Sequence, residues 1–237
     1  MTAGEMDSID EQRCHKCSVD NQYIIDPDVD SCQKCPPGLV CQGDATVQRV
    51  VENSTWIRHQ AGSSQVFKLV SCPSGYRRVS TDGEWELQEC EPCGKGEECT
   101  NATCITCAPC QPGYYKAAVS TDACLACPAD RYRETAGASD LGLCRKCQLK
   151  SSTQGMRGQT SRRSCECDRE YYLITSDEGL ASESLLCQTC PKGARCADDE
   201  CALRNEGFNC SDGSGIVGNW SKDDTGHYRL TSCPAGY

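Results

Sequence analysis

The stretch Cys110-Gln-Pro-Gly-Tyr-Tyr, followed by Cys124-Leu-Ala-Cys127, sets the pattern of the whole chain. Cysteine pairs alternate with short segments rich in Gly, Ser, Thr, Pro and Asp, and no sustained helical periodicity occurs. The other pairs are Cys14/Cys17, Cys32/Cys35, Cys90/Cys93, Cys104/Cys107, Cys107/Cys110, Cys144/Cys147, Cys187/Cys190 and the tighter Cys165/Cys167. This pattern predicts a small disulfide-rich, mainly β fold, an elongated tandem array of cystine-stapled ribbons with little helix.

Disulfides must supply much of the stability, because the chain is poor in core-forming side chains. Of 237 residues 24 are cysteine, whereas Leu, Ile, Val and Phe together make up about one residue in seven. That share cannot offset the entropy of ordering the backbone, about 1–2 kcal/mol per residue. A disulfide that closes a loop of about 15 residues contributes about 3 kcal/mol. Because so many disulfides persist only in oxidising surroundings, we expect an extracellular or cell-surface protein of the secretory pathway.

The charge and the apolar pattern exclude several partners. A formal net charge of −10 argues against nucleic acid and against anionic membranes. No run approaches 18 apolar residues, so we expect no membrane span in this chain. Residues 1–7 lack the basic start and the apolar run of a signal peptide, which indicates a mature form or an excised segment of a secreted protein.

The chain also repeats itself over a long period. Two blocks recur: Cys32-Gln-Lys-Cys-Pro-Pro-Gly-Leu-Val-Cys41 as Cys187-Gln-Thr-Cys-Pro-Lys-Gly-Ala-Arg-Cys196, and Leu69-Val-Ser-Cys-Pro-Ser-Gly-Tyr76 as Leu230-Thr-Ser-Cys-Pro-Ala-Gly-Tyr237. Trp56 and Trp220 precede the second block in each copy. A fixed long period predicts an array of stacked units.

These matches predict three regions. Residues 14–93 are a cysteine-rich start of the first copy, with an inserted β-module at about 42–76. Residues 94–172 form a second cysteine-rich segment. Residues 165–237 repeat 14–76 and form a truncated second copy.

Residues 110–172 resemble the ephrin-receptor-like cysteine-rich module, also written as the GCC2/GCC3 repeat. The matching text continues from Cys127 as Pro-Ala-Asp-Arg-Tyr, then Gly137-Ala-Ser, Cys144-Arg-Lys-Cys147 and Cys165-Glu-Cys167-Asp-Arg-Glu-Tyr-Tyr172. The resemblance implies an extracellular rod of small ribbons without catalysis. Residues 35–72 and 190–233 depart from it and are interpreted as the β-module. The whole chain is more loosely similar to long cysteine-rich surface and filament glycoproteins of protists and algae, such as the subunits of flagellar hairs (mastigonemes).

Metal binding and catalysis are the rival interpretations. Cys-x-x-Cys pairs can hold zinc, but here they alternate with single cysteines and the chain has three histidines. Asp26-Pro-Asp28-Val-Asp30 alternates carboxylates, yet Ser31 and Pro37 replace the Gly and Glu of an EF-hand. We therefore expect a solvated turn there and no metal or other cofactor. Without a nucleophile, triad or phosphate-loop motif, we also expect no catalytic residue and no enzymatic activity.

Four sequons indicate N-linked glycans, at Asn53, Asn101, Asn209 and Asn219. We expect Asn53 and Asn219 to occupy matching, exposed places on the two copies of the β-module. The neighbouring tryptophans either anchor the small cores of these modules, which we favour, or form a stacking platform for a ligand.

In a rod of small modules each cysteine bonds a near neighbour, and the two members of a pair face opposite loops. The predicted bonds are Cys17–Cys32, Cys72–Cys90, Cys110–Cys124, Cys127–Cys144, Cys147–Cys165 and Cys167–Cys187, with Cys35–Cys41, Cys93–Cys99 and Cys190–Cys196 as shorter loops. Cys14 and Cys233 then lack partners, which predicts bonds to a neighbouring unit. A local bond of Cys14, for example to Cys104, is the alternative.

These features predict a structural extracellular glycoprotein, the repeat-bearing subunit of a filament, hair or coat. Its partners would be identical copies head to tail or neighbouring repeats of a longer chain. The alternative is a binding ectodomain, either an adhesin or the stalk of a receptor.

Overall fold

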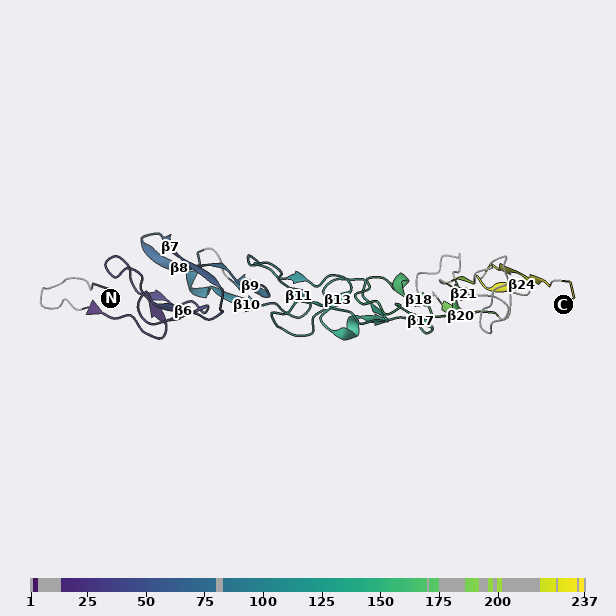
Figure 1. The fold of residues 1–237 in the computed structure, drawn as a ribbon. Coiled ribbons are helices and arrows are strands. Elements are labelled where there is room, and N and C mark those ends of the chain that lie inside the picture. Colours follow the sequence, from purple (N-terminus) through teal and green to yellow (C-terminus); the bar gives the residue numbers. More distant parts are fainter. Residues whose placement is uncertain are drawn as a thin grey trace. The chain divides into compact units, whose positions relative to one another are not determined.

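The computed structural model describes residues 2–3, 14–79, 83–169, 171–174, 186–191, 196–197, 200–201, 218–224, 226–233 and 235–236 (Figure 1). In these residues every strand belongs to an antiparallel two-stranded ribbon, and the helical residues are confined to three 3-10 turns. The prediction of a small disulfide-rich, mainly β fold of tandem ribbons is therefore confirmed.

The chain divides into two compact units, Met1–Cys110 with Lys116–Cys124, and Gln111–Tyr115 with Leu125–Tyr237. The ribbons of the first unit are β1 (Thr2–Ala3) with β2 (Cys14–His15), β3 (Gln22–Tyr23) with β4 (Gln33–Lys34), β5 (Leu39–Cys41) with β6 (Val47–Arg49), β7 (Thr55–Ala61) with β8 (Ser64–Ser71), β9 (Tyr76–Val79) with β10 (Glu89–Pro92), and β11 (Glu97–Glu98) with β12 (Ala108–Pro109). The turn η2 (Trp85–Leu87) lies between β9 and β10. The three regions predicted from the sequence repeat stay a prediction.

The second unit continues the same architecture. Its ribbons are β13 (Tyr114–Tyr115) with β14 (Leu125–Ala126), β15 (Arg131–Tyr132) with β16 (Arg145–Lys146), β17 (Ser151–Ser152) with β18 (Glu166–Cys167), β19 (Tyr171–Ile174) with β20 (Leu186–Thr189), β21 (Cys196–Ala197) with β22 (Glu200–Cys201), and β23 (Asn219–Lys222) with β24 (Tyr228–Ser232). The turns η3 (Leu141–Leu143) and η4 (Arg162–Ser164) precede β16 and β18.

The first β-module, which we define as the hairpin β7–β8 and the side chains packed on it, has a small apolar core. Tyr23, Leu39 and Phe67 belong to one buried cluster, and Leu69 belongs to a second. Trp56 packs against both clusters, and its Nε1 donates to Ser54 Oγ at 3.1 Å. Trp56 therefore anchors the core of its module, as favoured from the sequence.

The ribbons β11–β12, β13–β14, β15–β16 and β17–β18, called the cystine ribbons below, have no comparable cluster of apolar side chains among the described residues. Their buried apolar positions are mostly half-cystines: Cys93, Cys99, Cys107, Cys110, Cys127, Cys144, Cys165 and Cys167. The disulfides that these cysteines form take the place of the aliphatic side chains of an ordinary core.

One backbone turn recurs in all four cystine ribbons. The residue before the first strand has a positive φ, and its carbonyl accepts a hydrogen bond from a backbone N–H that follows the second strand. These four residues are Gly96, Gly113, Asp130 and Lys150, with φ of 74°, 83°, 61° and 66°. The left-handed turn therefore recurs even where the sequence does not supply a glycine.

Candidate functional site

The disulfide framework is the most regular chemical feature of the chain. All six longer bonds expected from the spacing are present: Cys17–Cys32, Cys72–Cys90, Cys110–Cys124, Cys127–Cys144, Cys147–Cys165 and Cys167–Cys187. Their Cα–Cα distances are 5.6–5.8 Å, inside the range that a disulfide can bridge. The shorter loop Cys35–Cys41 is also closed, at 6.0 Å. Three Cys-x-x-Cys pairs therefore each join two successive ribbons: Cys107/Cys110, Cys124/Cys127 and Cys144/Cys147.

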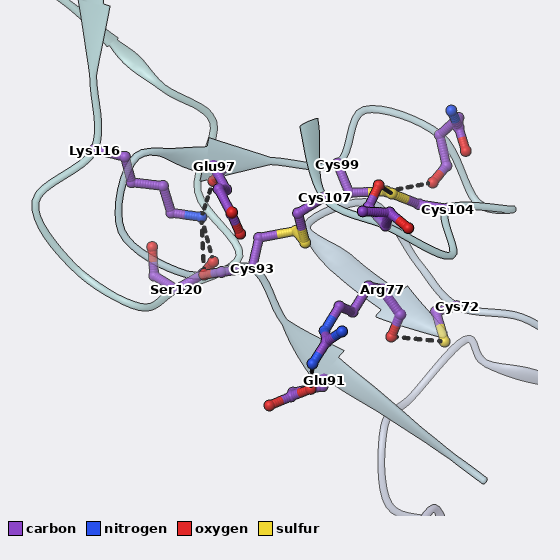
Figure 2. The surroundings of a disulfide bond; sticks show 12 residues. Cys72, Arg77, Glu91, Cys93, Glu97, Cys99, Cys104, Cys107, Lys116 and Ser120 are labelled. Atoms are coloured by element: carbon purple, nitrogen blue, oxygen red, sulfur yellow. Dashed lines mark hydrogen bonds and ion pairs between the residues drawn. A yellow bond between two sulfur atoms is a disulfide. The ribbon is translucent and has the colours of Figure 1, made fainter. Parts of the chain in front are cut away.

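The prediction of a Cys93–Cys99 bond is wrong. Cys93 bonds Cys107, and Cys99 bonds Cys104 (Figure 2). The reason is that β11–β12 is itself a cystine ribbon: its first strand begins at Glu97, four residues after Cys93, and its second begins directly after Cys107. The first strand of a ribbon also begins four residues after Cys110, Cys127 and Cys147. This repeated spacing in the sequence would have identified Cys107 as the partner of Cys93.

A buried lysine that the sequence did not indicate holds the loop beside this bond. Lys116 is 3% exposed, and its Nζ donates to the backbone carbonyls of Ser120 at 2.6 Å, Glu97 at 3.1 Å and Cys93 at 3.3 Å (Figure 2). The three carbonyls replace the water that would otherwise solvate the ammonium. This side chain thus links three backbone segments of the first unit.

Three of the four sequons lie in the described residues, and all three asparagines are exposed. In Asn101-Ala-Thr103 the Asn101 Oδ1 accepts hydrogen bonds from the Thr103 backbone N–H at 3.1 Å and from its hydroxyl at 3.3 Å. In the sequon of Asn219 the side-chain amide donates to Ser232 Oγ at 2.7 Å. Asn209 lies outside the described residues. Exposure leaves these three sites open to glycosylation, which stays a prediction.

The prediction that Asn53 and Asn219 occupy matching places is wrong. The register of β7–β8 shifts between Thr55 and Trp56, and that of β23–β24 shifts between Asn219 and Trp220. Asn219 therefore takes the place of Thr55, whereas Asn53 lies in the turn before β7 with φ of 62°. The cause is the different spacing from asparagine to tryptophan, three residues in one copy and one in the other.

In the acidic turn at residues 26–30, the carboxylates of Asp26 and Asp30 accept hydrogen bonds from backbone N–H groups. Asp30 is 4% exposed, and its two oxygens accept from the backbone N–H groups of Asp26 at 3.0 Å and Gln65 at 2.9 Å. The sequence predicted a solvated turn, and at Asp30 this prediction is wrong. The Asp30 side chain is buried and ties the turn to β8. Among the described residues no group of three or more His, Cys, Asp and Glu side chains could hold a metal ion.

Cys14 and Cys233 were both expected to lack a partner within the chain, and the structure describes the side chain of Cys233 but not that of Cys14. Cys233 is a free, exposed cysteine. The backbone of Cys14 lies in β2, but its side chain is outside the described part, so its bonding stays a prediction. Cys190 is disulfide-bonded. The side chain of Cys196, its predicted partner, is not among those described.

Comparison with known proteins supports the resemblance seen in the sequence. Residues 96–144 match the family described as "Tyrosine-protein kinase ephrin type A/B receptor-like". The chain therefore contains an ephrin-receptor-like cysteine-rich repeat, which begins earlier and ends earlier than the predicted 110–172. No curated protein matches the chain. In the described residues no helix is long and apolar enough to cross a membrane. The disulfides and the repeat together indicate an extracellular or secreted protein.

Proposed function

We propose that this chain is a structural, non-catalytic extracellular glycoprotein, whose repeated modules build a filament, hair or coat. The observation that supports this best is the recurrence of one ribbon design along the chain. Bonds of nearly equal Cα–Cα distance and the same left-handed turn recur from one cystine ribbon to the next. Such repeats contact mainly their neighbours, which suits extension along one direction.

The duplicated β-module supports the same proposal. Hairpins β7–β8 and β23–β24 place Trp56 and Trp220 opposite leucines in the same register. A repeat that returns along a chain presents the same surface more than once, as assembly of an array requires. The looser similarity to flagellar hair subunits belongs to this proposal as well.

A binding ectodomain is the second candidate, and the family match favours it. The matched family is named after a receptor, and its repeat in this chain covers about a fifth of the residues. In that role the cystine ribbons would be a stalk that holds a recognition surface away from the membrane. The acidic net charge of −10 and the exposed sequons fit both candidates.

Negative-stain electron microscopy and light scattering of the secreted chain separate the two candidates. The structural role predicts ordered polymers of many copies, in which cross-linking joins one copy to the next. A chain that stays monomeric at high concentration and binds a cell-surface ligand would contradict it and support the ectodomain. The mass lost on enzymatic removal of N-glycans tests the glycoprotein part, and Asn101→Gln should lower that loss by one glycan.

A further inference from the structure

One stretch of the second unit is strongly basic, although the formal net charge of the whole chain is −10. Residues 131–163 contain eight Arg and Lys side chains against two acidic ones, a net charge of +6. At physiological salt the field of an exposed charge is screened within about 8 Å. A ligand at this stretch therefore responds to the local cations more than to the net charge of the chain. Seven of the eight form no ion pair with any described residue: Arg131, Arg133, Arg145, Lys146, Lys150, Arg157 and Arg163.

Three of these cations lie together on the ribbon β15–β16. Arg131 faces Lys146 across the two strands, and Arg133 follows directly after β15. The guanidinium groups of the two arginines reach consecutive carbonyls, because Arg131 donates to Cys144 at 2.8 Å and Arg133 to Leu143 at 3.4 Å. Both groups therefore lie beside the same short segment of backbone. We call Arg131, Arg133 and Lys146 the cationic face.

The backbone bonds hold the two guanidinium groups in place without neutralising them. Arg133 also donates through Nε to the Thr135 carbonyl at 3.1 Å. A guanidinium has five N–H donors, so each group keeps donors for a ligand. Guanidinium binds the oxygens of an anion in pairs, and holding the group in advance reduces the entropy lost on binding. The cationic face is therefore suited to an oxyanion such as a sulfate group.

A groove of about 530 Å³ lies between the cationic face and the ribbon β17–β18. Arg131 and Lys146 line it, as do Ser152 of β17 and Asp168, which follows β18. Neither the Asp168 carboxylate nor the Ser152 hydroxyl has a hydrogen bond or an ion pair within the described residues. A groove of this size has room for a sugar unit.

The groove thus combines cations with hydrogen-bond acceptors. The Asp168 carboxylate accepts from hydroxyl groups, and the Ser152 hydroxyl donates or accepts. A second carboxylate in the groove, that of Asp130, already accepts from the Thr153 N–H at 3.0 Å. A polymer that carries only phosphate is repelled by Asp168. A polymer that carries both sulfate and hydroxyl groups finds a partner for each.

The rival occupant is the acidic stretch 83–98 of a second copy, which contains six glutamates and one lysine. Two of these glutamates already have cationic partners in their own chain. Glu86 forms an ion pair with Lys34 at 3.4 Å, and Glu91 pairs with Arg77. Binding to another copy would break these pairs, so the observations favour a ligand from outside the chain.

We propose that the cationic face and its groove bind a sulfated polysaccharide. Sulfate groups pair with Arg131, Arg133 and Lys146, and sugar hydroxyls donate to Asp168. This inference goes beyond the proposed function, because it adds a binding activity that a filament subunit or a receptor stalk would carry equally.

Surface plasmon resonance of the whole chain over immobilised heparin at physiological salt tests the site. We expect Arg131→Gln with Lys146→Gln to raise the Kd at least about tenfold, because two charged contacts are lost. The matched control is Arg58→Gln with Lys95→Gln, which removes the same charge from two exposed residues of the first unit and should change the Kd less than about twofold. Lys146→Gln alone leaves the bond from Arg131 to Cys144 intact and should raise the Kd about threefold. Equal weakening by the two double variants would overturn the inference.

Asp168→Ala separates a sulfated polysaccharide from other polyanions. It should weaken heparin about threefold, because an acceptor for hydroxyls is lost, and should tighten polyphosphate, because a repulsive charge is removed. Tighter binding of both polymers would overturn the assignment to a polysaccharide. So would duplex DNA or anionic lipid vesicles that bind more tightly than heparin, or hyaluronan, which lacks sulfate, binding as tightly. Self-association that Arg131→Gln with Lys146→Gln abolishes in the absence of heparin would assign the face to a second copy instead.

Discussion

The first β-module and the cystine ribbons are ordered by different forces. In the module, Trp56, Phe67 and Leu69 pack side chain against side chain. In the cystine ribbons the strands are two residues long, and the buried positions are largely half-cystines. One chain thus combines a region stabilised by hydrophobic burial with one stabilised by covalent bonds that restrict the unfolded state.

The largest effect is expected in the core of the module. Leu69→Ala removes a fully buried side chain and should lower the free energy of unfolding of the module by about 4 kcal/mol. The matched control is Leu230→Ala at the corresponding exposed position, with an expected change within about 0.5 kcal/mol. Urea unfolding followed by tryptophan fluorescence measures both. Equal losses in the two variants would mean that the hairpins are equally buried.

A smaller effect is expected from one bond of the cystine ribbons. Cys127→Ser with Cys144→Ser opens a loop of sequence separation 17 and should cost about 3 kcal/mol. Hydrogen exchange should show the loss in β15–β16 and not in β7–β8. The control, Cys99→Ser with Cys104→Ser, opens a separation of 5 and should cost about 2 kcal/mol. A larger loss in the control would contradict the entropic explanation.

The next smaller effect is expected from the buried side-chain amide of Gln88. Gln88→Ala leaves the Leu69 N–H and the Phe67 carbonyl buried without a partner, and should cost about 2 kcal/mol. Gln60→Ala on β7 removes an exposed glutamine of the same hairpin, so its unfolding midpoint should hardly move. If both variants unfold at the same urea concentration, the amide does not close the strand edge.

The smallest expected effect is a pH dependence of the module. Burial raises the pKa of Tyr23 above its ordinary value of 10.0, although the hydrogen bond from Phe67 opposes this. Above pH 10 the unfolded chain therefore loses the phenol proton first, and the stability that Tyr23 contributes below that pH declines as pH rises through the folded pKa. Unfolding at pH 8 to 11 should show this decline, and Tyr23→Phe should remove it. An unchanged decline in that variant would assign it to another group.

Local spacing made most of the framework predictable. The interval between cysteine pairs and the turn residues after them specify bonds between near neighbours, such as Cys110–Cys124. The predicted partner of Cys93 was wrong because Cys99 is nearer in the sequence. The spacing of cysteines around the other cystine ribbons favours Cys107, which is the observed partner. The interval between asparagine and tryptophan likewise shows that Asn53 and Asn219 differ in place.

The contacts that depend on distant parts of the chain could not be predicted. Asp30 accepts from Gln65, 35 residues away, and Gln88 reaches β8 from 19 residues away. Lys116 is buried, and its ammonium group donates to three backbone carbonyls. Nothing in the neighbouring sequence distinguishes this lysine from an exposed one. Pattern and spacing report local structure, whereas these groups are buried by how separate segments pack.

Disulfides hold the cystine ribbons, whereas side-chain packing holds the first β-module. Hydrogen exchange of the whole chain during stepwise reduction tests it most directly. We expect amide protection of residues 93–167 to fall to the level of an unfolded chain as the bonds open, while the amides of Phe67 and Leu69 keep measurable protection. Loss of protection in both regions at the same reductant concentration, or retention in the ribbons after full reduction, would contradict it.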